Sequence, residues 1–227
     1  MDQITSKEKI LKKVRLALNF KQKNPYLNID LESNVFTPFP VGESLIENFA
    51  KNFTSQHGQF IACDNQFDFI DKLLTLIEQR RWKYMFCWED DLQKKLKDVT
   101  ITFIEKKEQL EKIQASITTC EALISRRGSI LVSSAKNSRV LTIWPSVHIV
   151  VAFKSQVVSE VKDAFTIIRN NYGRNSPSML SFITGPSRTT DIPTDRPIEE
   201  SNVVIGAQGP QELILFLIDD SIKDKLI

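Results

Sequence analysis

Apolar and basic residues alternate at helical spacing near the start of the chain. If residues 7–18 form a helix, one face is apolar and carries Ile10, Leu11, Val14, Ala17 and Leu18. Basic residues surround this face: Lys9, Lys12, Lys13 and Arg15. The pattern predicts an amphipathic basic helix. Such a helix docks on its own domain or on a partner subunit, or it lies on a membrane surface; docking is the commoner use.

A segment of different character follows this helix. Residues 20–42 contain Pro25, Pro38, Pro40 and Gly42 among aromatic and polar residues, which favours an extended arm over regular structure. The chain therefore divides into an N-terminal helix and extended arm, residues 1–55, and a main domain, residues 56–227.

Helix and strand patterns alternate through the first half of the main domain. Asn65 can cap a helix whose apolar positions share one face: Phe67, Ile70, Leu73, Leu74 and Ile77. Strands are expected at residues 84–88, 99–104 and 129–133, a charged helix at 105–113 and a brief helix at 120–125. This alternation is typical of an α/β domain.

A nearly continuous apolar run at residues 147–153 predicts a central strand, because such runs suit strands that helices cover on both faces. A helix capped by Ser159 and ended by Gly173 is expected next, with an apolar face made of Val161, Ala164, Phe165 and Ile168. Strands at 179–184 and 202–205 each precede a glycine, and a strand at 212–218 closes the sheet. We therefore expect an α/β fold with an open sheet between two helical layers.

Charge and composition exclude several classes of protein. The 227 residues include 30 basic and 28 acidic side chains, and a net charge of +2 gives no basic field that would attract nucleic acid. No stretch approaches the roughly 18 to 20 apolar residues of a transmembrane segment, and the first residues lack an apolar signal core. We expect a soluble, cytoplasmic protein.

Cysteine and histidine give little support for a metal site. Cys63, Cys87 and Cys120 form no CxxC pair, so zinc or an iron–sulfur cluster is not expected in this chain. We expect instead that the three are buried thiols in a reducing compartment. His148 lies within an apolar strand, where a histidine is more often packed and hydrogen-bonded than a ligand.

Two glycine loops follow predicted strands and carry the candidate chemistry. The first is ITGPSRTTDI at residues 183–192, where Gly185 is flexible and Pro186 is stiff. The residues after them offer hydroxyl and guanidinium donors that suit an oxyanion: Ser187, Arg188, Thr189 and Thr190. Asp191 can orient Arg188 or accept from the backbone. A purely structural turn with an Arg–Asp pair is an equally open interpretation.

The second loop contains Gly206, Gln208, Gly209 and Pro210. Its small residues allow a ligand or the first loop to approach, and Gln208 offers one acceptor and two donors. Neither a Walker loop nor GxGxxG is present, so a nucleotide-phosphate site is not predicted. Ligands of open α/β sheets bind beyond the carboxyl ends of strands, where we expect both loops.

These segments together resemble the LUD-domain family, in particular proteins related to lactate utilization protein C (LutC/YkgG-like). The resemblance covers roughly residues 117–218 and rests on four stretches: ITTCEALISRRGSILVSS, WPSVHIVVAF, FITGPSRTTDI and VVIGAQGPQELILFLI. It implies a three-layer fold of the NagB/RpiA/CoA transferase type. The characteristic residues that match are Gly128, Pro145, His148, Gly185, Pro186, Ser187, Arg188, Thr189, Asp191, Gly206, Gly209 and Pro210.

The resemblance also implies a part in oxidising L-lactate to pyruvate, beside an iron–sulfur subunit and a further oxidoreductase subunit. This chain would itself bind no cofactor. Three departures concern the chemistry: Ser125, Arg126 and Arg127 replace a small residue, an acid and a threonine; Gln208 replaces a histidine; and residues 193–201 form an insertion that displaces an acid to Glu199 or Glu200.

The departures remove two acid–base candidates and favour binding of an anion over proton transfer. We therefore expect a noncatalytic or weakly catalytic subunit that holds a small carboxylate or phosphate at the two loops. One alternative is an autonomous isomerase or acyl/CoA-transferase-like enzyme, for which Glu121 and Asp191 are the candidate catalytic acids. A metabolite-sensing scaffold module is the other.

Overall fold

The structure is a computed structural model that describes residues 5–19, 42, 44–98, 101, 103, 112–136, 142–191, 202–206 and 208–220. It separates into two compact units, Met1–Phe39 and Pro40–Ile227. In the first unit, helix α1 (Ser6–Asn19) confirms the helix expected at residues 7–18, and none of its residues is buried. The arm expected at residues 20–42 lies almost wholly outside the described residues.

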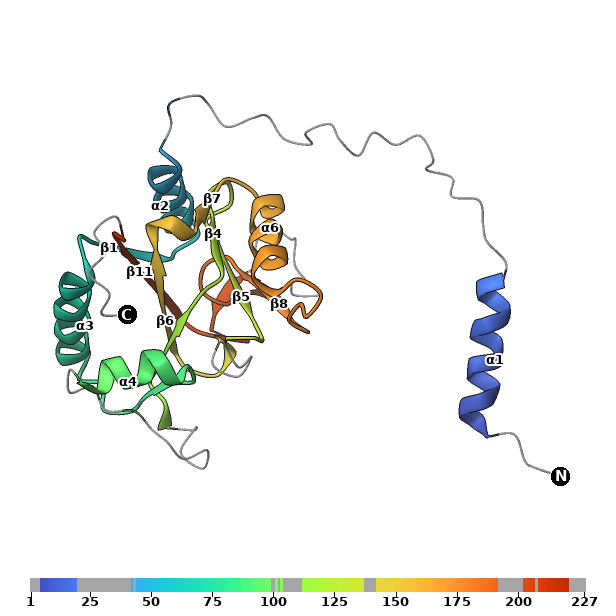
Figure 1. The fold of residues 1–227 in the computed structure, drawn as a ribbon. Helices are drawn as coiled ribbons and strands as arrows, with labels where there is room; N and C mark the ends of the chain where they lie inside the picture. The colour runs from blue at the N-terminus through green and yellow to red at the C-terminus, as the bar shows by residue number, and fades with distance from the viewer. Residues whose placement is uncertain are drawn as a thin grey trace. The chain divides into compact units, whose positions relative to one another are not determined.

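Five parallel strands form the main sheet of the second unit (Figure 1). They lie in the order β1-β11-β6-β3-β2 and span Gln59–Cys63, Glu212–Ile218, Val147–Phe153, Ala115–Thr119 and Met85–Cys87. Strand β6 is central, as its apolar run predicts. Strand β11 does not close the sheet: it lies inside it, between β1 and β6, because β1 adds a further edge strand that the sequence pattern missed.

A second, mixed sheet packs against the first. Its order is β7-β4-β5-β8, with strands Val157–Val158, Ala122–Ile124, Ser129–Ser133 and Leu180–Ile183. The brief helix expected at residues 120–125 is wrong, since this segment contains strand β4, whose three residues are fully buried. A short, wholly buried apolar run has no periodicity that separates helix from strand.

Helices cover the two sheets in layers (Figure 1). Helices α3 (Gln66–Arg80) and α4 (Asp90–Asp98) pack on one face of the parallel sheet. On its other face lie α2 (Leu45–Ser55) and the mixed sheet, and α6 (Val161–Tyr172) covers the far side of the mixed sheet. A 3-10 turn, η2 (Lys154–Gln156), follows β6. The α/β fold expected from the sequence is confirmed.

Local signals set the helix ends accurately, but the apolar faces less so. Asn65 caps α3 by accepting a hydrogen bond from the backbone N–H of Asp68, as expected. The cap of α6 is Glu160, one residue after the expected Ser159, and Gly173 ends that helix. Three residues expected on these faces are exposed: Phe67, at 60%, Val161 and Phe165. The expected Leu73, Ala164 and Ile168 are buried, and the buried face of α3 also includes Phe69, which the pattern did not predict.

Helix α2 packs as part of the α/β unit. Phe49 and Phe53 are fully buried against the strands of the parallel and mixed sheets. Gly128, at φ +60°, lies so close that a Cβ there would be 2.3 Å from the backbone nitrogen of Phe53. The compact unit thus begins before the division after residue 55 that the sequence indicated, because two phenylalanines of α2 complete its core.

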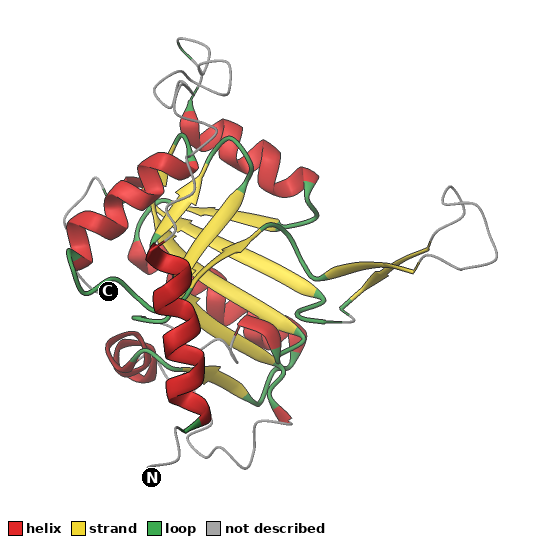
Figure 2. Ribbon diagram, turned by 90° about the vertical axis from the view of Figure 1, so that its right-hand side faces the viewer, coloured by secondary structure: helices red, strands yellow, loops and turns green. Residues whose placement is uncertain are grey.

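The polar end of the first glycine loop continues as a strand. Residues Arg188–Asp191 form β9 and pair in antiparallel fashion with β10 (Asn202–Ile205), as a two-stranded ribbon that extends from the sheets (Figure 2). Three expectations fall largely outside the described residues: the strand at 99–104, the helix at 105–113 and the insertion at 193–201.

Candidate functional site

The two glycine loops meet in the structure. The backbone N–H of Ser187 donates to the carbonyl of Pro210 over 2.9 Å, and the N–H of Gly206 donates to the carbonyl of Ser187 over 2.8 Å. Together they line a cavity of about 200 Å³, here called the loop pocket, to which six residues of the loops contribute: Gly185, Pro186, Ser187, Gln208, Gly209 and Pro210. The prediction that the two loops form one ligand site rests on these contacts and on the cavity that both loops line.

Gly185 is required by its surroundings. Its φ is +74°, a region that side chains with a Cβ rarely adopt, and a Cβ there would lie 2.1 Å from the carbonyl oxygen of Gln56. Gln56, at the end of α2, thus packs directly against the first loop. A glycine at this position is explained by packing alone, whether or not the loop binds a ligand.

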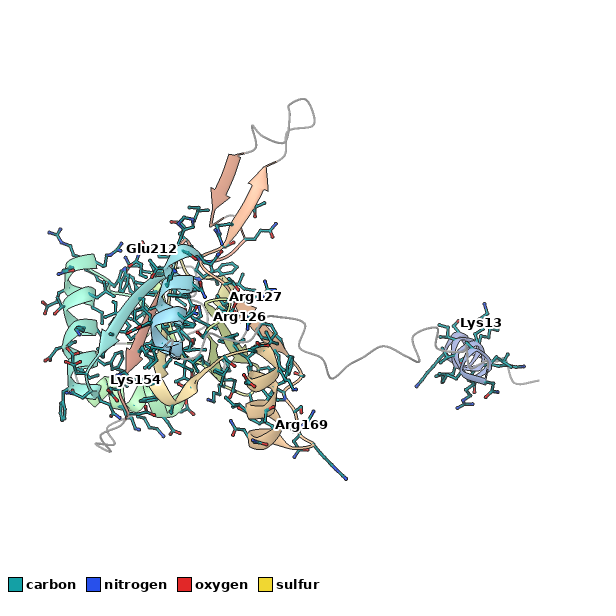
Figure 3. All side chains as sticks on the ribbon, turned by 90° about the horizontal axis from the view of Figure 1, so that it is seen from above. Lys13, Arg126, Arg127, Lys154, Arg169 and Glu212 are labelled. Carbon is teal, nitrogen blue, oxygen red and sulfur yellow. The ribbon has the colours of Figure 1, made fainter. Side chains whose placement is uncertain are left out.

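The loop pocket lies at the amino edge of the parallel sheet, where its strands begin. The backbone N–H groups of Gln211 and Glu212 both donate to the carbonyl of Ser146, just before β11 and β6. Figure 3 labels Glu212 at this edge and Lys154, which follows β6, at the other. The expected place at the carboxyl ends was wrong for the parallel sheet, because β8 and β10, which precede the loops, belong to other pairings.

His148 forms an inner wall of the loop pocket. The residue is fully buried on β6, and its Nε2 lies 2.8 Å from the hydroxyl of Thr118. Its Nδ1 has no hydrogen-bond partner among the residues that the structure describes. Burial lowers the pKa of His148 to about 4, so the imidazole is neutral at pH 7. The sequence predicted a packed, hydrogen-bonded histidine. The prediction describes Nε2, but it does not describe Nδ1, which has no partner among the described residues.

Arg188 does not line the loop pocket. Its Nη2 donates to the side-chain oxygen of Gln56 over 2.8 Å, in an exposed position at the start of β9. Thr189 follows in the ribbon, opposite Val204. The side chain of Asp191 lies outside the described part of the chain, and so does the Arg–Asp pair that the sequence suggested. Anion binding by Arg188 stays a prediction.

The two arginines that depart from the family pattern occupy the turn between β4 and β5 (Figure 3). Arg126 pairs with Glu160 at 2.7 Å, and the side chain of Asn52 donates to the carbonyls of Ser125 and Arg126, which ties the turn to α2. The turn is not a helix end, as one interpretation of the sequence had it. It lies near the first glycine loop, since Ser129 and Thr184 share a hydrogen bond of 2.7 Å.

Glu121 lies away from the glycine loops, just after β3 at the carboxyl edge. Only 2% of the residue is exposed, and its Oε1 accepts hydrogen bonds of 2.6 Å from the hydroxyls of Ser133 and Tyr172. The Nζ of Lys136 is 3.4 Å from the other carboxylate oxygen. Burial and the bond to Glu121 raise the pKa of Tyr172 to about 12, so this hydroxyl remains a donor at neutral pH.

A larger pocket, which the sequence did not predict, opens beside Glu121. Its volume is about 590 Å³, and its walls include Trp88, Glu89, Thr119 and Lys136; we call it the carboxyl-edge pocket. Burial raises the pKa of Glu89 above its usual value, although hydrogen bonds from Thr119 oppose the shift. The signal that could have found it is the position of Glu89, directly after the strand expected at residues 84–88.

The three cysteines behave as buried thiols. Burial raises the pKa of Cys63 to about 11 and those of Cys87 and Cys120 to about 12, so each remains protonated at neutral pH. Among the described residues no group of three or more histidine, cysteine, aspartate or glutamate side chains could hold a metal ion. No helix in the described part of the chain is long and apolar enough to cross a membrane.

Comparisons with known proteins agree with the architecture. A family model described as the LUD domain matches residues 46–218, a longer part of the chain than the resemblance at 117–218. A 1.70 Å crystal structure of a DUF162 family protein from Deinococcus radiodurans superposes with a TM-score of 0.55 at 14% identity, covering 76% of this chain and 95% of that one. This likeness supports the fold.

Curated relatives match the chain over a shorter region. Lactate utilization protein C of Bacillus subtilis (strain 168) is 30% identical over 119 residues, which are 51% of this chain and 47% of that protein. The protein of the same name from Shouchella clausii (strain KSM-K16) is 30% identical over 115 residues, 50% of this chain and 47% of that protein. The chain therefore spans about half the length of the curated relatives it matches.

Proposed function

This chain belongs to the LUD domain family, and from that membership we propose that it takes part in lactate utilisation. Support comes from the curated relatives, which are named lactate utilization protein C. The part we assign to this chain is to hold a small carboxylate, L-lactate or pyruvate, in the loop pocket.

The observation that carries this proposal is the closure of both glycine loops over His148. A cavity of about 200 Å³ suits a small molecule, since pockets for drug-sized ligands begin near 300 Å³. In the tautomer in which Nε2 accepts from Thr118, Nδ1 carries the proton and can donate to a ligand oxygen. Gln208 adds an amide from the opposite loop. Neutral donors of this kind bind and orient a carboxylate without exchanging protons with it.

The oxidation of L-lactate to pyruvate releases two electrons and two protons. We propose that the electrons pass to an iron–sulfur cluster in a partner subunit, and from there to a further oxidoreductase subunit. Support comes from the family resemblance and from the cysteine spacing of this chain, which contains no CxxC motif. Copurification of the tagged chain from cells grown on lactate should recover an iron-containing protein, and repeated recovery of the chain alone would count against the partnership.

Calorimetric titration with L-lactate and pyruvate tests the pocket itself. Gln208 and Gln211 are both exposed glutamines of the second loop region, and only Gln208 lines the loop pocket. Gln208→Ala should weaken binding by about fivefold, as expected for one neutral hydrogen bond of about 1 kcal/mol, and Gln211→Ala should not. Equal affinities in both variants, or no binding by the unmodified chain, would refute a carboxylate site at the loops.

A further inference from the structure

The carboxyl-edge pocket lies where an open parallel sheet offers its loops to a ligand. It is bounded by the carboxyl ends of β2, β3 and β6: Trp88 directly follows β2, and Thr119 and Phe153 are the last residues of β3 and β6. Side chains and backbone groups from neighbouring parallel strands converge at this edge. The volume of about 590 Å³ is within the range of small-molecule sites.

Glu89 is held in the wall of this pocket in a fixed orientation. One carboxylate oxygen accepts the backbone N–H of Thr119 over 2.6 Å, and the other accepts the hydroxyl of the same residue over 2.5 Å. Its pKa is raised by burial, and the charge of Glu121 raises it further. A raised pKa makes the carboxylate a stronger base than an exposed glutamate, and its fixed position directs it into the pocket.

Lys136 lies in the same wall, and Glu121 fixes its ammonium group. The Nζ donates to the carbonyl of Cys120 over 3.2 Å and lies 3.4 Å from Oε2 of Glu121. Glu121 is in turn held by the hydroxyls of Ser133 and Tyr172. An ammonium has three N–H donors, so at least one remains for a ligand oxygen among the contacts of the described residues.

The charges and the aromatic residue of the pocket define the class of ligand. Among the described residues, three acids line the pocket, Glu89, Asp90 and Asp91, against two lysines, Lys95 and Lys136, and Glu121 adds a negative charge behind the wall. This balance disfavours an anion. The indole of Trp88, 49% exposed, offers an apolar face to C–H groups, and the aspartates at the rim accept from hydroxyls. An uncharged carbonyl compound with neighbouring hydroxyls meets all of these groups.

We propose that the carboxyl-edge pocket is a second site, at which Glu89 and Lys136 carry out proton transfer on a small uncharged hydroxycarbonyl compound. Glu89 removes a proton from the carbon beside the carbonyl group. The electron pair of that C–H bond forms a carbon–carbon double bond, and the carbonyl oxygen becomes an enolate oxygen that accepts a hydrogen bond from Lys136. Glu89 then returns the proton to carbon, so the step needs no oxidant or reductant. Glu121 and Thr119 position the two reacting groups.

Deuterium exchange measures this step directly. The chain is incubated in D₂O with dihydroxyacetone, glyceraldehyde or hydroxyacetone, and proton NMR follows the loss of the signal of the carbon beside the carbonyl. The unmodified chain should exchange at least one of the three faster than buffer. Glu89→Gln should slow this exchange by about 100-fold or more, and Lys136→Met by at least about tenfold. Circular dichroism and thermal unfolding verify that each variant is folded.

Matched variants control for charge and surface changes. Glu78 and Lys94 are exposed and line neither pocket, so Glu78→Gln and Lys94→Met should retain the exchange rate of the unmodified chain. Absence of exchange for all three probes would overturn the proposal, and so would equal rates in the Glu89 and Glu78 variants. Titration with L-lactate can succeed or fail independently of either result.

The pH profile of exchange tests whether Glu121 acts on the reacting groups. The charged groups around Glu89 are Asp90, Asp91 and Lys95 from α4, Lys136 after β5, and Glu121 after β3. Exchange should rise as Glu89 loses its proton. Glu121→Gln removes a negative charge that raises the pKa of Glu89, so the rise should move to lower pH. A variant with an unchanged profile would show that Glu121 is structural only.

Discussion

The neutral state of His148 predicts a measurable dependence of stability on pH. The side chain is fully buried on β6, and burial lowers its pKa to about 4 from the usual 6.5. The unfolded chain therefore binds a proton at this residue at pH values where the folded chain does not. Stability from this residue is fully present above pH 6.5 and is lost as the pH falls toward 4.

The size of the effect follows from the shift. One pKa unit corresponds to about 1.36 kcal/mol. The free energy of unfolding should therefore fall by about 2 kcal/mol between pH 8 and pH 5 through this residue, and by about 3 kcal/mol once the pH is below the folded-state pKa. Urea denaturation at pH 8 and pH 5 gives the free energy of unfolding for the unmodified chain and for His148→Gln. The variant should lose about 2 kcal/mol less on acidification, because it has no proton to bind at this position.

A matched variant and a refuting result make this test sharp. His57, the second histidine, is exposed and has φ +65°, so His57→Asn replaces it with a residue that tolerates this backbone. This variant should lose the same stability as the unmodified chain between pH 8 and pH 5. The other titratable groups are the same in each protein compared, so their contributions cancel in the comparison. Equal losses in the His148 and His57 variants would refute a buried neutral imidazole in the loop pocket.

Three other predictions concern packing and the first loop. Phe53→Ala should lower the free energy of unfolding by about 3 to 5 kcal/mol in urea denaturation, because the ring is fully buried; a loss below about 1 kcal/mol would contradict the packing of α2. Gly185→Ala should destabilise more than Gly173→Ala, since both have positive φ but only at Gly185 would a Cβ meet backbone, 2.1 Å from a carbonyl oxygen; equal melting temperatures would disprove this. Arg188→Lys should change stability by about 1 kcal/mol or less, because the side chain is exposed, and a loss of L-lactate affinity in the same variant would bring Arg188 into the ligand site.

The sequence predicted most of the strands and helices because their signals are local. The cap at Asn65, the apolar run of β6 and the terminating Gly173 each depend on neighbouring residues only, and each lies where expected. The strands β1 and β4 were missed or misassigned for the opposite reason. Strand β1 pairs with the distant strand β11, and β4 pairs with the distant β7 as well as with its neighbour β5, and no local pattern records these long-range pairings.

The candidate sites could be predicted only in part for a similar reason. The two glycine loops were found because glycine, proline and polar residues cluster in each, but the edge of the sheet at which they lie depends on strand order. The placement of Glu121 at the opposite edge likewise follows from the direction of β3. The residues predicted from sequence therefore included one residue behind the wall of the carboxyl-edge pocket, Glu121, together with residues of the loop pocket.

The register of one strand pair explains how the carboxyl-edge pocket forms from distant parts of the chain. Strands β2 and β3 are parallel, and Cys87 lies opposite Ile117. Two residues further along each chain, the same register places Glu89 opposite Thr119, which gives the two hydrogen bonds that hold its carboxylate. Glu89 precedes residues 117–218, where the sequence motifs lie, whereas Thr119, Glu121 and Lys136 are within that range; the family model at residues 46–218 covers all four. Neither stretch forms the pocket alone, because the parallel pairing of β2 and β3 brings Glu89 to Thr119, and Lys136 reaches the same pocket from the segment after β5 of the mixed sheet.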